Sequence, residues 1–357
     1  MEDARTAGAD VGAVAGRAAA VRRAQVRRQV RRFLTRGAIA LVIFVCVGRL
    51  IQQAILDKAQ FVSVTMNGIT FAGLLFVVAS GFTLAFGLMR VVNMAHGSLY
   101  LLGGYFAFEI QGQGDVFTGG EPKHSWWLSA LIASLTIGIV GLLIQQLLLR
   151  WNQGEMLQQA LITIAVSVIA ADQMLAHFGG LPEAIKKPPA MEGSIDLHLF
   201  GVTYPKDRMY MLFFAIIIGI LLFAWVHRTR MGMIVRAGVD DRMMVSALGI
   251  NIERVFAISF FIGALLAGFG GTLGGTTLSL APGQDGTFLV WSLVVVIVGG
   301  MGSLGGAAVG ALLLGLVSNY SAVYLPQQYT NYSILLVFAL LVIVLALRPL
   351  GLFGRPA

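Results

Sequence analysis

The sequence predicts an all-α polytopic membrane protein, and two observations support this fold class. Hydrophobic residues make up 57% of the chain and charged residues only 12%, whereas a soluble domain carries about 25% charged residues. The apolar residues also occur in long blocks, and the block from Gly286 to Leu347 contains no Asp, Glu, Lys, Arg or His. At about 1.5 Å per residue, this block alone would cross a roughly 30 Å hydrocarbon core about three times.

The N-terminal part divides into a polar arm and an apolar stretch. Residues 1–36 are rich in Ala and Arg, which is typical of a cytoplasmic arm attracted to anionic lipid headgroups, although a protein partner or RNA would also suit it. The stretch 37–56 follows without a convincing cleavage site, so we expect an extra, retained transmembrane helix. Cys46 is the only cysteine, so the chain can form no internal disulfide or cysteine-based metal site.

Nine further hydrophobic segments bring the expected total to about 9–10 transmembrane helices. The first and sixth exceed a perpendicular span, which implies tilt or a break. The seventh is too short for a span and ends in the glycine-rich run Gly299–Gly306, which favours a broken or re-entrant helix near 288–306. The segments are 61–88, 91–110, 126–149, 159–178, 208–227, 255–280, 288–300, 305–324 and 331–347.

The distribution of basic residues predicts the orientation. With the N-terminus inside, Lys and Arg favour the inside segments by about three to one. The net charge of +8 is therefore mainly a topology signal, and we expect no nucleic-acid partner. The outside segments hold Lys58, Lys123, Lys186, Lys187, Lys206 and Arg208.

The largest inside loop, 228–254, has the length and amphipathic character of a docking helix. Asp240 or Asp241 can cap a short helix that ends before Gly249. A solvated loop would not need the apolar groups that this helix would present, and a flexible face of this kind suits a groove on a partner protein. A helix lying on lipid is the alternative. The presented residues are Met243, Met244 and Leu248.

A second motif, Val91 to Gly97, follows Arg90 at an inside boundary. Asn93 and His96 are three residues apart and would share a helix face. A polar pair in a bilayer segment usually faces the bundle interior, where it either forms a structural hydrogen bond between helices or lines a pathway. A proton relay would need a carboxylate partner, and Glu109 is more than two turns away.

The chain lacks the chemistry of an enzyme or an ATPase. Charges within the expected spans are limited to Arg49, Glu109 and Asp172, fewer than ion-coupled carriers usually need. No motif pairs Glu109 and Asp172, or His96, around a metal or a nucleophile, so an intramembrane enzyme is disfavoured. No Gly-Lys pair occurs anywhere, so the usual phosphate-binding loop is absent and any ATP-driven work must come from a partner.

Over about residues 60–356 the chain resembles the permease subunits of bacterial ATP-binding-cassette importers for branched-chain amino acids, of the LivH type. The resemblance rests on ordered motifs, although Met94, Val245 and Met301 depart from the usual pattern. The motifs are Met66–Thr70, Gly87–Gly97, Arg230–Gly232 through Leu248–Asn251, Val298–Ser303 and Arg348–Pro356.

The resemblance implies a permease domain over 57–357 in a bacterial inner membrane, with no cofactor, and the distribution of basic residues predicts a cytoplasmic N-terminus. It also implies a second, LivM-like permease, two cytoplasmic ATPases and a periplasmic solute-binding protein. The solute would be a branched-chain amino acid; relatives of similar sequence carry urea, short amides and aromatic acids. A self-contained channel or secondary carrier is the alternative.

Two groups of residues follow as candidate sites. Pathway or gating elements are Asn93, His96, Gly299, Gly300, Gly302 and Ser303. ATPase-coupling residues are Asp240, Asp241, Met243, Met244, Leu248 and Gly249.

Overall fold

The structure is a computed structural model that describes residues 56–89, 93–112, 124–152, 155–198, 201–240, 242–326, 328 and 332–354. The chain divides into two compact units, Met1–Phe61 and Val62–Ala357. The expected arm at 1–36 and the expected first helix at 37–56 lie outside the described residues.

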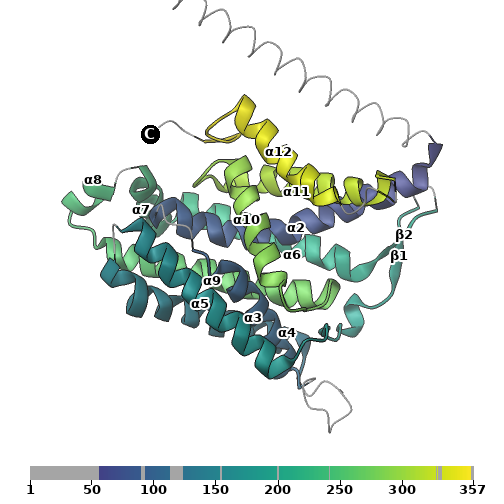
Figure 1. Ribbon diagram of the computed structural model, residues 1–357, viewed down its shortest axis with the longest axis horizontal. Coiled ribbons are helices and arrows are strands. Elements are labelled where there is room, and N and C mark those ends of the chain that lie inside the picture. The colour runs from purple at the N-terminus through teal and green to yellow at the C-terminus, as the bar shows by residue number, and fades with distance from the viewer. Residues whose placement is uncertain are drawn as a thin grey trace, which may run out of the picture. The chain divides into compact units, whose positions relative to one another are not determined.

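All nine hydrophobic segments beyond residue 60 form helices, which confirms the all-α membrane fold (Figure 1). In chain order the elements are α2 (Lys58–Met89), α3 (His96–Ile110), α4 (Trp126–Leu143), a π-helical turn (Ile144–Leu149), a 3-10 turn (Arg150–Asn152), α5 (Met156–Phe178), a 3-10 turn (Pro189–Met191), β1 (Ser194–Asp196), β2 (Thr203–Pro205), α6 (Lys206–Arg228), α7 (Arg230–Asp240), α8 (Arg242–Ala247), α9 (Ile252–Thr277), α10 (Gln284–Gly299), α11 (Leu304–Tyr324) and α12 (Ser333–Leu347).

In the described part of the chain, six helices are long and apolar enough to cross a membrane: α2, α4 with its continuation to Asn152, α5, α6, α9 and α11. The apolar helices α10 and α12 are shorter, as is α3. Helix α2 runs unbroken for 32 residues, about 48 Å at the usual rise. Because it is unbroken, its excess length over a roughly 30 Å core calls for tilt rather than a break.

Helix α9 is the centre of the packed interior and lies against both α3 and α4. Small residues make this possible, because a Cβ added at Gly103 of α3 would come 2.3 Å from the Cα of Gly268 on α9. Helix α10 contacts α3 on one side and α11 and α12 on the other, and Figure 1 shows it between these groups. Helix α10 therefore links the two groups of helices.

Short backbone pairings hold parts of the loop 179–207 in place. Strands β1 and β2 pair antiparallel, with Ile195 opposite Tyr204. Earlier in the loop, Glu183 and Leu280 exchange backbone hydrogen bonds of 2.8 and 2.6 Å. The loop thus holds the segment between α9 and α10.

Helix α10 begins level with the middle of α5. The Ser98 hydroxyl in the first turn of α3 lies 2.8 Å from that of Ser167, the middle residue of the 23-residue helix α5. A Cβ at Gly97 would meet the carbonyl oxygen of Asp285 in the first turn of α10. Both α3 and α10 therefore start at about half the depth of α5.

The irregular backbone at mid-depth therefore lies before α10 and not after it, where the sequence predicted it. The segment before α10 carries Ser279 and Gly283 with φ of 83° and 86°, and it returns the chain from the end of α9 to mid-depth. The glycine run Gly299–Gly306, where the sequence places the break, instead joins α10 and α11 as a turn. The short helix expected at 288–300 is present, but it starts four residues earlier, at Gln284.

Candidate functional site

The loop predicted to dock a partner folds as two helices. Helix α7 ends at Asp240 and α8 begins at Arg242. Asp240 is therefore the last residue of α7 and not the N-terminal cap of a single docking helix. Asp241 lies outside the described residues. Helix α8 ends before Gly249, whose φ of 77° is left-handed, as expected from its place in the sequence.

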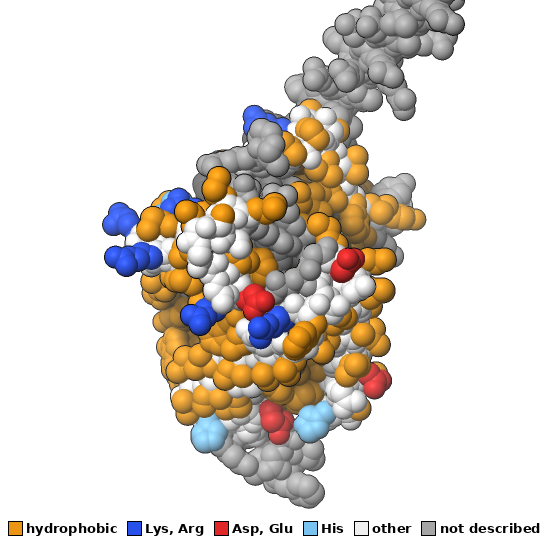
Figure 2. All heavy atoms as spheres, turned by 90° about the vertical axis from the view of Figure 1, so that its left-hand side faces the viewer, with side chains coloured by type: hydrophobic (Ala, Val, Ile, Leu, Met, Phe, Trp, Pro, Cys, Tyr) orange, Lys and Arg blue, Asp and Glu red, His pale blue; other side chains and the backbone are white. Residues whose placement is uncertain are grey.

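Helix α8 presents an apolar surface. The exposed fractions of Met243, Met244 and Leu248 are 84%, 61% and 72%, whereas Val245 is 3% exposed and anchors the helix. Figure 2 faces this end of the molecule and shows Lys and Arg side chains standing among apolar ones. The structure therefore combines basic and exposed apolar groups at the end that carries α8.

The glycine turn lies at the same end as α7 and α8. A Cβ at Gly302 would come 3.2 Å from Cγ1 of Val239 on α7, and one at Gly87 would come 3.0 Å from the Cα of Gly302. The N–H groups of Leu352 and Phe353 donate to the carbonyls of Val298 and Gly299, each at 2.9 Å. The turn is thus enclosed by α2, α7 and the C-terminal segment.

Local chemistry explains the shape of this turn. Gly300 and Gly302 have φ of 103° and 80°, values that favour glycine. Ser303 then caps α11 by accepting a hydrogen bond from the Gly306 N–H at 3.0 Å. Helices α10 and α11 contact each other through Gly299 of α10 and Gly306 of α11, whose backbones touch directly.

Asn93 and His96 do not share a helix face, because α3 begins at His96 and Asn93 lies in the turn before it. The Asn93 Oδ1 accepts a hydrogen bond from the Ala95 N–H at 3.0 Å. The His96 Nε2 lies 2.9 Å from the Val78 carbonyl oxygen of α2, and its ring meets Phe82 edge-on. Both side chains are buried; Asn93 shapes the turn before α3, and His96 fixes the start of α3 against α2.

Asp285 is a functional candidate that the sequence analysis missed. Its Oδ2 lies 3.4 Å from the Ser98 Oγ, next to the Ser98–Ser167 pair at mid-depth. The charges considered from sequence were Arg49, Glu109 and Asp172. Glu109 and Asp172 are exposed in the structure, on α3 and α5. The Pro282-Gly283 pair before Asp285 was the available signal, because such a pair marks a turn, here just ahead of the apolar block that begins at Gly286.

A polar cluster at the opposite end explains the Met66–Thr70 motif. The Tyr204 hydroxyl of β2 donates to the Asn67 Oδ1 at 3.0 Å and lies 2.8 Å from the Thr70 Oγ1. Arg208 also donates to the Asn67 Oδ1. Burial raises the pKa of Tyr204, so its hydroxyl stays protonated and able to donate.

Tyr204→Phe is expected to lower stability by about 1–2 kcal/mol, because the buried Thr70 and the partly buried Asn67 on α2 both lose a hydrogen-bond partner. Thermal unfolding of the purified chain in detergent would measure this. Tyr210→Phe, on the neighbouring α6, is the matched control. Equal melting temperatures for wild type and Tyr204→Phe would contradict a stabilising role.

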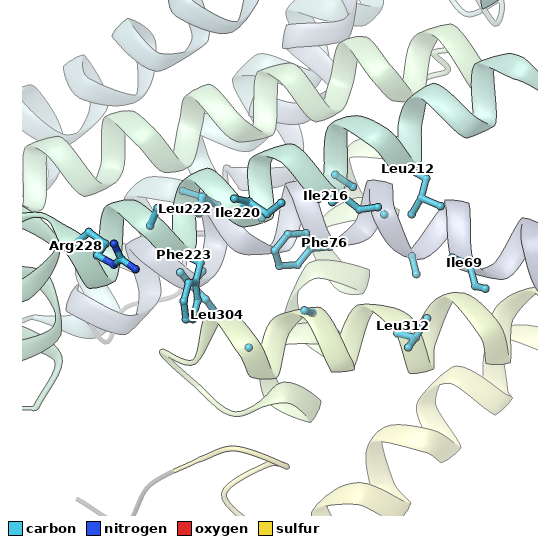
Figure 3. A pocket seen from close by; sticks show the side chains of 17 residues that line it. Ile69, Phe76, Leu212, Ile216, Ile220, Leu222, Phe223, Arg228, Leu304 and Leu312 are labelled. Atoms are coloured by element: carbon cyan, nitrogen blue, oxygen red, sulfur yellow. The ribbon is translucent and has the colours of Figure 1, made fainter.

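A separate groove of about 700 Å³ runs between α2, α6 and α11 (Figure 3). Its lining is almost wholly apolar, with Phe76, Ile216 and Leu312 along its length and Arg228 at one end. Such a surface suits lipid chains or another apolar helix rather than a polar solute.

The fold and these sites define a class of protein: a polytopic helical membrane subunit whose basic end presents an exposed apolar helix. The chain belongs to the family described as the branched-chain amino acid transport system / permease component, whose model matches residues 64–345.

Curated relatives agree with this family. The chain is 29% identical to the high-affinity branched-chain amino acid transport system permease protein BraD of Pseudomonas aeruginosa, over 82% of this chain and 95% of that protein. It is 28% identical to LivH of Escherichia coli K12, over 83% and 96%. It is 27% identical to LivM of the same bacterium, over 81% and 69%. These relatives are permease proteins rather than enzymes.

Proposed function

We propose that this chain is the transmembrane permease subunit of an ATP-driven importer for branched-chain amino acids or a related small polar solute. The observation that carries the proposal is the exposed apolar face of α8 at the basic end of a chain that belongs to this permease family. Exposure of Met243, Met244 and Leu248 to water is unfavourable for a subunit that works alone. Burial of these side chains against a partner would be favourable.

The partners follow from the two ends of the molecule. An ATPase would receive α8 in a groove at the basic end, and a solute-binding protein would approach the opposite end, which holds the loop 179–207. Because the chain resembles both LivH and LivM, a second, related permease would complete the pathway. The basic end would face the cytoplasm of a bacterial inner membrane, as the positive-inside rule favours.

The gating elements of the proposal are the glycine turn and the start of α3. Gly299, Gly300, Gly302 and Ser303 form the turn that touches Val239 of α7, so a displacement of α8 and α7 would reach α10 directly. His96 holds the start of α3 against α2 and Asn93 shapes the turn before it, which positions α3 beside the first turn of α10.

Reconstitution separates this proposal from a self-contained channel or carrier. The chain alone in liposomes is expected to move no radiolabelled leucine or urea. The complete importer, with its second permease, ATPases and loaded binding protein, is expected to accumulate solute only with ATP inside the compartment that holds the ATPases. ATP-independent uptake by the lone chain would overturn the proposal.

A further inference from the structure

Asp285 is a carboxylate held within the membrane part of the protein. Its neighbour Ser98 bonds to Ser167, the middle residue of α5. Ser167 lies roughly 16 Å from either end of that helix, so Asp285 lies at about the same depth. An ionisable group at such depth is costly unless it meets a partner or a cavity. Its position in the transport domain therefore needs a physical reason.

The protein itself satisfies this carboxylate only in part. Its one hydrogen bond among the described residues is the 3.4 Å contact from the Ser98 Oγ to Oδ2. The ion pairs found in the described ranges are Arg150–Glu253 and Lys187–Asp207, and neither involves Asp285. At least one acceptor oxygen therefore remains to be filled.

The carboxylate also has open space beside it. Asp285 is partly exposed, and Gly286 and Thr287, which follow it in the first turn of α10, are exposed. A Cβ added at Gly286 would meet no atom within 4 Å. A small solute could therefore approach this face of α10 without displacing a side chain of this chain.

A carboxylate flanked by hydroxyls complements a cation that donates hydrogen bonds. An ammonium group supplies three N–H donors and a positive charge, which matches a free carboxylate oxygen with the Ser98 and Ser167 hydroxyls next to it. Asp285 also lies in the first turn of a helix, where a negative charge interacts favourably with the helix dipole. That interaction would stabilise α10 whatever the solute.

We propose that Asp285, with the hydroxyls of Ser98 and Ser167, binds the ammonium group of a solute as it passes through the middle of the permease. The inference rests on the proposed transport function and deepens it. It gives the permease a preference for amine-bearing solutes that is independent of the binding protein. A neutral amide such as urea would gain no ion pair there.

Charge variants in the complete importer test the proposal on transport. For Asp285→Asn, leucine uptake is expected to fall at least tenfold, while ATP hydrolysis stimulated by leucine-loaded binding protein stays within twofold of wild type. Asp285→Glu is expected to restore uptake to within threefold. Asp172→Asn, at another acidic residue of the helical bundle, is the control and should transport normally.

A labelling experiment tests the site without transport. In a Cys46→Ser background, Thr287→Cys provides a unique thiol two residues from Asp285. The cationic reagent 2-aminoethyl methanethiosulfonate is expected to react faster, relative to the neutral 2-hydroxyethyl reagent, than it does when Asp285→Asn is added. The ratio of the two rates should fall about tenfold in that variant.

The outcomes separate the two levels of inference. If the wild-type importer moves no leucine, the proposed function fails for that solute, whereas the labelling ratio still decides the cation site. An unchanged ratio, or unchanged leucine uptake in Asp285→Asn, overturns the site. Loss of the second permease on purification of Asp285→Asn would also overturn it, because Asp285 would then be an ion-pair residue between subunits.

Discussion

Met244→Asp is expected to abolish ATP hydrolysis coupled to transport while leaving the chain inserted in the membrane. Met244 is 61% exposed on α8, whose apolar face we assign to an ATPase groove. Burying an unpaired carboxylate in such a groove costs about 3 kcal/mol or more, which corresponds to roughly a hundredfold weaker docking. The measurement is ATPase activity of the reconstituted importer with and without loaded binding protein.

The control for this variant keeps the apolar character of the side chain. Met244→Leu should retain stimulated hydrolysis, and both variants should yield similar amounts of membrane-inserted chain. Since Val245 beside it is buried and anchors α8, the exposed position can change without disturbing the fold. Normal stimulated ATPase activity in Met244→Asp would show that α8 does not carry the docking contact.

Gly306→Ala is expected to separate α10 from α11 and to lower both stability and transport. A Cβ at Gly306 would lie 2.2 Å from the carbonyl oxygen of Gly299, and backbone atoms cannot rotate away as a side chain can. Overpacking of this kind costs about 1–3 kcal/mol, or about 5 °C in melting temperature for a domain of this size. Thermal unfolding and leucine uptake would both record the change.

The adjacent glycine provides a matched control. A Cβ at Gly305 would meet no atom within 4 Å, and alanine is favoured over glycine in a helix by about 1 kcal/mol. Gly305→Ala should therefore melt at the wild-type temperature or slightly above it. Equal melting temperatures for the two alanine variants would show that the Gly299–Gly306 contact does not limit the approach of α10 and α11.

Together the proposals describe a route from the ATPase to the solute. Docking forces on α8 would pass to α7, whose Val239 touches the glycine turn at Gly302. The turn is continuous with α10, and Asp285 lies in the first turn of that helix. A shift of α10 transmitted in this way would move Asp285 relative to Ser98 and Ser167. The affinity of these three residues for an ammonium group would then change.

The sequence by itself determined the class of protein and the positions of nine helices, because apolar block length and turn residues are local properties of the chain. It also indicated Met243, Met244 and Leu248 as a presented face, and these side chains are exposed.

Only the tertiary structure decided how deep the short helix begins, that Asn93 precedes α3 instead of sharing its face, and that Asp285 meets Ser98 across 187 residues of chain. These features depend on which backbones approach closely, at contacts such as Gly97 with Asp285 and Gly103 with Gly268. Hydrophobicity reports that a segment is buried in a membrane, but it does not report the depth or the neighbour, since lipid and packed protein are equally apolar surroundings.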